Sequence, residues 1–227
     1  MLGLSIPFYD EEGAVEQVLH QTRYVLQEAN IPFIIAAVNN GSSDKTSLII
    51  DEFAEKNDCV IPIHFDVNQG YGGGILSGMR ALAMQNVTVI GWGWGDGQVL
   101  PNVLPDLYQL CLDGHPLAKA RRDRRKDGWI RKVITQSYAQ TMRRLGVNTR
   151  DINGCPKLFR IADWSSLEAS SEDWFLDAEV ILKAEHKGWE IGEATVTMEP
   201  RYYNQSKVRF STVVEFMQNI IQWKLRR

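Results

Sequence analysis

Strand-like and helix-like patterns alternate along the first 91 residues, and this alternation limits the possible folds more than any other feature of the sequence. Short β-branched and aliphatic runs predict strands at residues 4–8, 33–38, 60–65 and 87–91. Apolar residues at helical spacing predict intervening helices at residues 11–29, 44–56 and 75–84. Such alternation is typical of a parallel sheet covered by helices. Ligands of these sheets bind beyond the carboxyl ends of the strands, so the loops that follow the strands form the candidate site.

The second half of the chain is predicted to be mixed rather than regularly alternating. We expect helices at residues 102–112, 129–145, 173–186 and 212–225, strands at 117–120 and 190–198, and an irregular to extended segment at 151–160. The sequence has no internal repeat and no linker rich in Ser, Pro or Gly. We therefore expect a single mixed α/β domain over residues 1–227, in which the part after about residue 115 covers a crevice formed by the first part.

The composition is that of a water-soluble globular protein, with 44% hydrophobic and 23% charged residues. The longest apolar run, Ile31–Val38, is far shorter than the roughly 18–20 residues that span a bilayer. No basic leader precedes the first predicted strand, so we expect no signal peptide. The three cysteines are odd in number and far apart, which fits a reducing compartment and neither a disulfide framework nor a zinc site. We expect a cytoplasmic location.

Positive charge is concentrated in one segment of a chain whose net charge is −3. Residues 119–132 contain eight basic and two acidic residues, so this segment carries +6 and the rest of the chain −9. Such a segment either binds an anion, such as a phosphate, a lipid headgroup or a nucleic acid, or forms a solvated loop. We expect no nucleic-acid binding, because Trp129 is the single aromatic residue among the basic ones and the rest of the chain is acidic.

Two polar loops follow the first and second predicted strands. Residues 7–12 contain an aromatic ring and carboxylates, which can contact a planar, hydrogen-bonding base, although an acidic turn before a helix has the same composition. Residues 39–46 offer amide and hydroxyl groups beside a glycine, which suit either a base or ribose or a plain turn with a helix cap.

Two glycine-rich loops follow the third and fourth predicted strands. Residues 68–74 let a backbone approach a ligand closely, but they lack the Gly-Lys-Ser/Thr of a Walker loop and the position of a dinucleotide fingerprint. In residues 91–98, Asp96 and Gln98 can place two oxygens on one Mg²⁺ or Mn²⁺ ion. Because a carboxylate and an amide are a small ligand set, a diphosphate would have to supply most of the remaining ligands.

Read in order, these loops resemble the motifs of family 2 glycosyltransferases. The chain has Pro-x-Tyr-x-Glu at 7–11, Gly-Ser-Ser-Asp-x-Thr at 41–46, Asn-x-Gly-x-Gly-Gly at 68–73 and Asp-Gly-Gln at 96–98. Further similar segments are Lys119-Ala120-Arg121, 151–160, Phe175–Glu179 and Arg201–Lys207, so the resemblance covers nearly the whole chain. The branch that it resembles most is that of dolichyl- or polyprenyl-phosphate mannosyl- and glucosyltransferases.

The resemblance implies a GT-A-like fold, with a mostly parallel, Rossmann-like sheet flanked by helices and a C-terminal acceptor-side elaboration. Residues 1–115 would bind a UDP-, GDP- or dTDP-linked sugar, and residues 116–227 would form the acceptor half and the C-terminal helix. The residues expected near the base and ribose are Pro7, Tyr9, Glu11, Asn39 and Asn40, with Asp96 near the diphosphate. Arg121, Arg131 and Arg201 would supply positive charge to the departing diphosphate.

The acceptor implied by the resemblance is a polyprenyl phosphate, and the reaction is an inverting sugar transfer. Arg131, Arg201, Ser206 and Lys207 would bind the acceptor phosphate, whose oxygen is already an anion and needs no strong base. We expect Arg121, Arg131, Arg201 and Lys207 to converge on the crevice, and Arg122, Arg124 and Arg125 to point outward. A hydroxyl of a small-molecule acceptor would need a base, for which Asp177 or Glu179 is the candidate.

The chain departs from the family pattern at two places. Asn39-Asn40 stand where the family has two aspartates, and Trp94 stands where the first Asp of the Asp-x-Asp metal motif is usual. A divalent cation would then depend on Asp96, Gln98 and substrate phosphates, or basic residues would replace it. The second departure also leaves open a non-catalytic, nucleotide-binding relative. The basic segment and the basic C-terminal end favour peripheral association with the inner face of a membrane.

Overall fold

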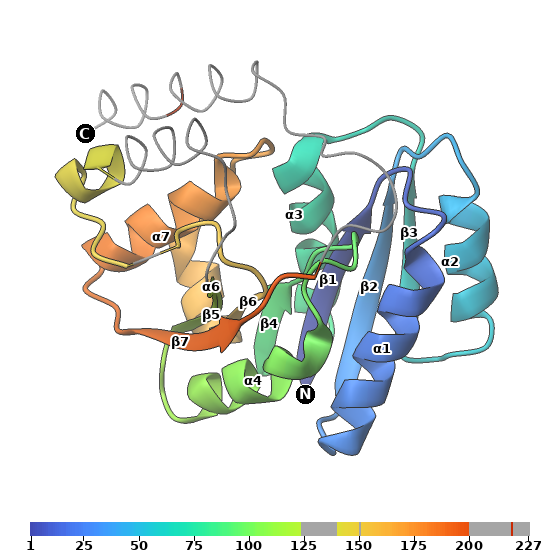
Figure 1. Cartoon of the computed structure of the whole chain (residues 1–227), viewed down its shortest axis with the longest axis horizontal. Helices are drawn as coiled ribbons and strands as arrows, with labels where there is room; N and C mark the ends of the chain where they lie inside the picture. Colours follow the sequence, from blue (N-terminus) through green and yellow to red (C-terminus); the bar gives the residue numbers. More distant parts are fainter. Residues whose placement is uncertain (124–139, 150, 200–218, 220–227) are drawn as a thin grey trace.

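The chain forms one seven-stranded sheet with the strand order β3-β2-β1-β4-β6-β5-β7 (Figure 1). The structure is a computed structural model that describes residues 1–123, 140–149, 151–199 and 219. The strands are β1 (Leu2–Phe8), β2 (Phe33–Asn40), β3 (Val60–Phe65), β4 (Val89–Trp92), β5 (Leu117–Arg122), β6 (Lys157–Arg160) and β7 (Ile191–Val196). The helices are α1 (Val15–Glu28), α2 (Thr46–Ala54), α3 (Gly70–Ala83), η1 (Pro101–Val103), α4 (Leu104–Leu112), α6 (Ile161–Leu167) and α7 (Leu176–His186). The predicted α/β class with a mostly parallel sheet is confirmed.

Strand direction brings several chain segments to one edge of the sheet. Strands β1, β2, β3 and β4 are parallel, and Phe8 pairs with Asn39 where β1 and β2 end. Strand β6 is antiparallel to both β4 and β5, so its first residue, Lys157, lies opposite Trp92, the last residue of β4. The carboxyl ends of β1, β2 and β4 therefore meet the amino end of β6 at the same edge.

Helices cover both faces of the sheet, and each face has its own apolar core. One core contains Leu4 and Ile6 of β1 together with residues of α1, α2 and α4. The other contains Ile90 and Trp92 of β4 together with residues of α3, α6 and α7. Because β1 and β4 are buried on both faces, they lack the alternation of polar and apolar residues that a strand with one exposed face shows.

Several element boundaries differ from the prediction. The expected loop at residues 70–74 is the first turn of α3, which begins at Gly70 rather than near residue 75. Glycine disfavours a helix, but a Cβ at Gly72 would lie 2.1 Å from the carbonyl oxygen of Ser171. Helix α6 was not predicted, and of the helix expected at 129–145 residues 140–144 are helical while 129–139 lie outside the described residues. The helix expected at 212–225 also lies outside them, apart from residue 219.

Within the described ranges, none of the helices is both long enough and apolar enough to span a bilayer.

Helix α3 packs so closely on β1 that one of its glycines is required sterically. A Cβ at Gly78 would lie 2.1 Å from Ser5 Oγ, and this hydroxyl donates a hydrogen bond to the carbonyl of Ile75. We expect Gly78→Ala to lower the free energy of unfolding by about 1–3 kcal/mol, the usual cost of overpacking a core. Chemical denaturation measures the change. Gly93→Ala is the control, because a Cβ there meets nothing within 4 Å, and equal effects of both variants would contradict the packing argument.

Candidate functional site

The loops that follow β1 and β2 are tied together by reciprocal hydrogen bonds. The backbone N–H of Ser43 donates to Asp10 Oδ1 at 2.7 Å, and the backbone N–H of Asp10 donates to Ser42 Oγ at 3.0 Å. In the same way, the backbone N–H of Glu12 donates to Asp44 Oδ2 at 3.0 Å. These bonds make one rigid edge from two loops that are more than 30 residues apart in sequence.

The residues expected to contact the base and ribose differ in how far they are exposed. Pro7 is partly buried in β1, Tyr9 is exposed, and Glu11 is buried with its backbone N–H bonded to Thr46 Oγ1 at 2.9 Å. Asn39 and Asn40 are buried at the end of β2. Tyr9 is thus the most exposed of these five side chains.

Asn40 holds the next loop rather than presenting its amide. Its Oδ1 accepts the backbone N–H of Gln69 at 3.0 Å, and its Nδ2 donates to the carbonyl of Gly70 at 2.9 Å. Asn39 Oδ1 accepts the N–H of Ser42 at 3.1 Å. An asparagine can do this where an aspartate cannot, because its amide both donates and accepts. The departure from the family pattern at Asn40 therefore has a structural use.

The segment after β4 offers few oxygen ligands for a metal ion. Asp96 Oδ1 accepts the backbone N–H of Gln98 at 3.0 Å, and the carbonyl of Gln98 accepts the N–H of Glu199 at 2.8 Å. No group of three His, Cys, Asp or Glu side chains suited to a metal occurs in the part of the chain that the structure describes. Mg²⁺ and Mn²⁺ favour sets of about six oxygens. These residues do not fit a cation held by the protein alone.

Trp94 is connected through its indole N–H to a buried carboxylate on α7. Its Nε1–H donates to the hydroxyl of Tyr71 at 2.9 Å, and this hydroxyl donates to Asp177 Oδ2 at 2.9 Å. The Tyr71 ring stacks on Trp174, with ring centroids 4.4 Å apart and an interplanar angle of 9°. Burial, together with the negative charge of Asp177, raises the pKa of the Tyr71 hydroxyl, so it stays a neutral hydrogen-bond donor.

Lys157 provides the cation for Asp177. Both side chains are buried, and the Lys157 ammonium contacts Asp177 Oδ1 and donates to the carbonyl of Gly154 at 2.8 Å. The ammonium also lies 5.7 Å from the centre of the Trp92 ring. A buried charge is stable only when it is paired and hydrogen-bonded, and this ion pair meets both conditions.

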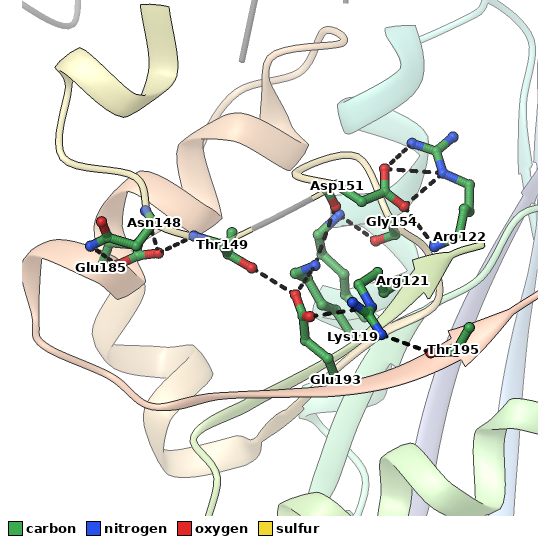
Figure 2. A network of polar contacts seen from close by, with 11 residues as sticks. Lys119, Arg121, Arg122, Asn148, Thr149, Asp151, Gly154, Glu185, Glu193 and Thr195 are labelled. Carbon is green, nitrogen blue, oxygen red and sulfur yellow. Dashed lines mark hydrogen bonds and ion pairs between the residues drawn. The ribbon is translucent and has the colours of Figure 1, made fainter. Parts of the chain in front are cut away.

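A second network of charges lies around β5 (Figure 2). Lys119 is fully buried, and its Nζ lies 2.7 Å from Glu193 Oε1. Burial lowers the pKa of the Lys119 ammonium, although Glu193 opposes this shift. Glu193 also accepts a hydrogen bond from Thr149 Oγ1 at 2.7 Å. Arg121 is half-exposed, with its Nε 3.6 Å from Glu193 and a hydrogen bond to Thr195.

Arg122 was expected to point outward, and the structure contradicts this. Its side chain is almost fully buried and forms an ion pair with Asp151, while its guanidinium carbon lies 5.5 Å from the centre of the Trp94 ring. Its backbone N–H also donates to Asp151 Oδ2 at 2.8 Å. The reason is that β5 extends to Arg122, so this residue belongs to the sheet and not to a loop.

The other predicted charged residues have different outcomes. Arg121 lies at the end of β5, as described above, whereas Arg131, Arg201, Ser206 and Lys207, together with Arg124 and Arg125, lie outside the described residues. The convergence of Arg121 with Arg131, Arg201 and Lys207 stays a prediction.

Glu179, a candidate base on α7, is buried, lies 2.7 Å from Lys183 Nζ and accepts the N–H of Ser171 at 2.8 Å. Burial alone would raise the pKa of Glu179, but these hydrogen bonds outweigh it and lower the pKa.

Sequence reasoning did not assign roles to Lys157, Tyr71, Trp174 and Asp151. Lys157 and Asp151 were part of a motif, and Tyr71 was part of a glycine-rich segment, but no local pattern shows that a charge is buried. The available signal was the presence of basic residues, such as Lys119 and Arg122, and of acidic residues, such as Asp151 and Glu193, in segments that the sheet brings together. That signal needs the strand order before it can be used.

The fold is shared with solved glycosyltransferase structures. Mannosyl-3-phosphoglycerate synthase from Rubrobacter xylanophilus matches with a TM-score of 0.69 at 12% identity, over 100% of this chain and 74% of that one. Glucosyl-3-phosphoglycerate synthase from Mycobacterium tuberculosis, in complex with Mn²⁺, UDP and glucosyl-3-phosphoglycerate, matches with a TM-score of 0.68 at 14% identity, over 97% and 77%. At this identity the likeness shows the fold alone, which is the GT-A fold.

The family model of glycosyl transferase family 2 matches residues 4–167, which is most of the chain. The chain therefore belongs to glycosyl transferase family 2.

Curated relatives carry the names of polyprenyl-phosphate sugar transferases. Undecaprenyl-phosphate 4-deoxy-4-formamido-L-arabinose transferase of Serratia proteamaculans is 25% identical over 151 residues, which are 66% of this chain and 45% of that protein. Polyprenol monophosphomannose synthase of Mycolicibacterium smegmatis is 25% identical over 232 residues, which are 97% of this chain and 86% of that protein. The chain thus spans about half the length of the arabinose transferases that it matches.

The Lys157–Asp177 ion pair should be required for stability. Lys157→Met leaves Asp177 buried without its cation, and we expect a loss of about 3–5 kcal/mol in the free energy of unfolding. Urea denaturation followed by circular dichroism measures this loss. The control is the double variant Lys157→Met/Asp177→Asn, which removes the buried charge and should recover most of the stability. A single variant as stable as the wild type would show that the pair is not needed.

Proposed function

We propose that this chain is an inverting glycosyltransferase that moves a sugar from a nucleotide-sugar donor to a polyprenyl-phosphate acceptor. The observation that carries the proposal is the edge where β1, β2 and β4 end. Tyr9 and Asp96 follow β1 and β4, and Asn39 lies in the last residues of β2, at a place where open α/β sheets bind ligands. Family membership and the names of the curated relatives support it.

The chemistry requires positive charge beside the departing diphosphate. As the bond from the anomeric carbon to the donor breaks, negative charge develops on the diphosphate, and preorganised cations stabilise it. Arg121 and Arg122 lie on β5, next to β6 and its buried Lys157. Under this proposal Arg131 and Arg201 add to this charge, while Arg131, Arg201, Ser206 and Lys207 hold the acceptor phosphate.

The pairing of the two candidate bases supports a phosphate acceptor over a hydroxyl acceptor. A hydroxyl must lose its proton to a base, whereas a phosphate oxygen is already an anion. The carboxylate of Asp177 is held by Lys157 and Tyr71, and that of Glu179 by Lys183. The lowered pKa of Glu179 makes it a weaker base still. The described carboxylates of α7 thus suit a reaction that needs no general base.

Asp96 is proposed to accept hydrogen bonds from the hydroxyl groups of the donor. Asp96 Oδ1 accepts a hydrogen bond from the backbone N–H of Gln98, which fixes the carboxylate in the turn after β4. A divalent cation at Asp96 and Gln98 would have to take most of its oxygen ligands from the substrate diphosphate. No step of the proposed reaction depends on such a cation.

Transfer can be tested with radiolabelled UDP-, GDP- and dTDP-sugars and a short polyprenyl phosphate. We expect product with the phosphate and none with the matched polyprenol, and an anomeric configuration opposite to that of the donor by NMR. Asp96→Ala should reduce turnover at least about tenfold, which is about 1.4 kcal/mol in the barrier. Asp113→Ala is the control, because Asp113 is exposed at the end of α4. Transfer to polyprenol instead would establish a hydroxyl acceptor, and binding without turnover a non-catalytic relative.

Peripheral membrane association is proposed through basic residues outside the described part of the chain. Lys119 and Arg122 are buried in ion pairs, so they cannot contribute to a membrane-facing patch. We expect flotation with anionic vesicles at low salt and release at high salt, since each basic residue near the surface contributes about 1 kcal/mol. Arg124→Ala should weaken only this association, whereas Arg201→Ala should reduce transfer. Absence of binding at low salt would contradict the membrane proposal.

A further inference from the structure

We propose that Arg122, held over the Trp94 indole by Asp151, binds the diphosphate of the donor nucleotide and makes donor binding independent of a divalent cation. The inference rests on the proposed function, because it assumes a nucleotide-sugar donor at this edge. It adds a residue that binds the donor, and it states that donor binding requires no divalent cation; the family resemblance supplies neither.

The position of Arg122 is fixed at three points. Its backbone N–H donates to Asp151 Oδ2 at 2.8 Å, its Nε donates to the same oxygen at 2.9 Å, and its Nη2 contacts Asp151 Oδ1. Only 6% of its side chain is exposed. Among the described residues, these bonds use the Nε and Nη2 edge of the planar guanidinium, so that the N–H groups of Nη1 can meet a second acceptor. A fork with one edge anchored and the other edge available is well suited to a phosphate oxygen.

Trp94 places this guanidinium beside the loop that follows β4. The indole is itself fixed, because its N–H donates to Tyr71 at 2.9 Å, and the guanidinium carbon lies 5.5 Å from the ring centre. The neighbouring backbone is open, since a Cβ at Gly93 would meet no atom within 4 Å. Asp96 follows two residues after Trp94 in the same loop. The cation and the loop expected to meet the diphosphate therefore belong to one cluster.

Three carboxylates near β5, β6 and β7 are unsuited to a metal because each is already paired with a basic side chain. Asp151 pairs with Arg122, Asp177 with Lys157, and Glu193 with Lys119. Recruiting any of them to Mg²⁺ or Mn²⁺ would leave Arg122, Lys157 or Lys119 buried without its carboxylate partner, which is strongly unfavourable. Trp94 lies two residues before Asp96, where a second carboxylate would complete a metal site. Its ring instead makes a cation–π contact with Arg122. A fixed guanidinium thus lies over the residue that stands where the metal motif has its first Asp.

The experiment measures nucleotide binding rather than turnover. Isothermal titration calorimetry is carried out with UDP and GDP on the full chain, once in EDTA and once in MnCl₂. We expect the Kd of the bound nucleotide to agree within about twofold between the two buffers, a difference of under about 0.5 kcal/mol. The double variant Arg122→Gln/Asp151→Asn, which keeps a neutral hydrogen-bonded pair, should weaken binding in EDTA at least about tenfold.

The matched control is Arg160→Gln/Asp163→Asn. This variant removes another Arg–Asp ion pair, at the far edge of the sheet where Arg160 pairs with Val89, the first residue of β4. It should bind nucleotide as the wild type does. Arg122→Lys is a second probe, which keeps the positive charge but loses the planar fork, and it should also weaken nucleotide binding. It replaces the double variant if that variant fails to fold.

The outcomes separate the inference from the proposed function. Nucleotide binding that appears only with Mn²⁺ would overturn the inference while leaving the glycosyltransferase proposal intact. Binding by a folded Arg122→Gln/Asp151→Asn variant that equals the wild type would also overturn it, and would show that the pair only anchors residues 151–156 to β5. If neither nucleotide binds in either buffer, both the nucleotide-sugar donor and the role of Arg122 are wrong.

Discussion

The buried ion pair between Lys157 and Asp177 is the interaction on which the site depends. It joins the first residue of β6 to the first turn of α7, and the Asp177 carboxylate also accepts the hydroxyl of Tyr71 from α3. Tyr71 in turn accepts the indole N–H of Trp94, which follows β4. Residues of β6, α7 and α3 therefore meet at one carboxylate, and the segment after β4 is linked to it through Tyr71. A buried ion pair adds little net stability compared with apolar packing, but losing one partner is costly, so it favours this single arrangement.

Strand β6 makes this arrangement possible because it runs against its neighbours. A parallel strand between β4 and β5 would bring its last residue to the edge where the loops of β1, β2 and β4 gather. An antiparallel strand brings its first residue there instead, and that residue is Lys157, opposite Trp92. The segment before β6 then contributes Asp151 and the carbonyl of Gly154 to the same cluster. The charges of the site are thus arranged by strand direction before any ligand binds, which is the preorganisation that electrostatic catalysis requires.

The pairing of these charges bears on both halves of the proposed reaction. On the donor side, Arg122 presents one anchored edge to Asp151 and sits over an indole, so a diphosphate meets a cation that needs no reorganisation. On the acceptor side, Asp177 and Glu179 are engaged by Lys157 and Lys183, which suits an acceptor that is already ionised. Both features follow from the same physical rule, that a carboxylate or ammonium removed from water must find a partner within the protein.

The sequence alone determined the parallel half of the sheet and the family, because these depend on local periodicity and on short motifs; the edge at which ligands would bind stays a prediction. It could not determine where α3 begins, since the glycines within residues 70–74 are typical of a loop. Only the structure shows that the backbone of Ser171 and Glu172 leaves no room for a side chain at Gly70 and Gly72 of this helix. Nor could it show that Arg122 turns inward to Asp151, 29 residues later, or that Lys157 meets Asp177, 20 residues later. Only the tertiary structure decided these contacts, because the partner of a buried charge is set by strand order and direction, and neither leaves a local pattern.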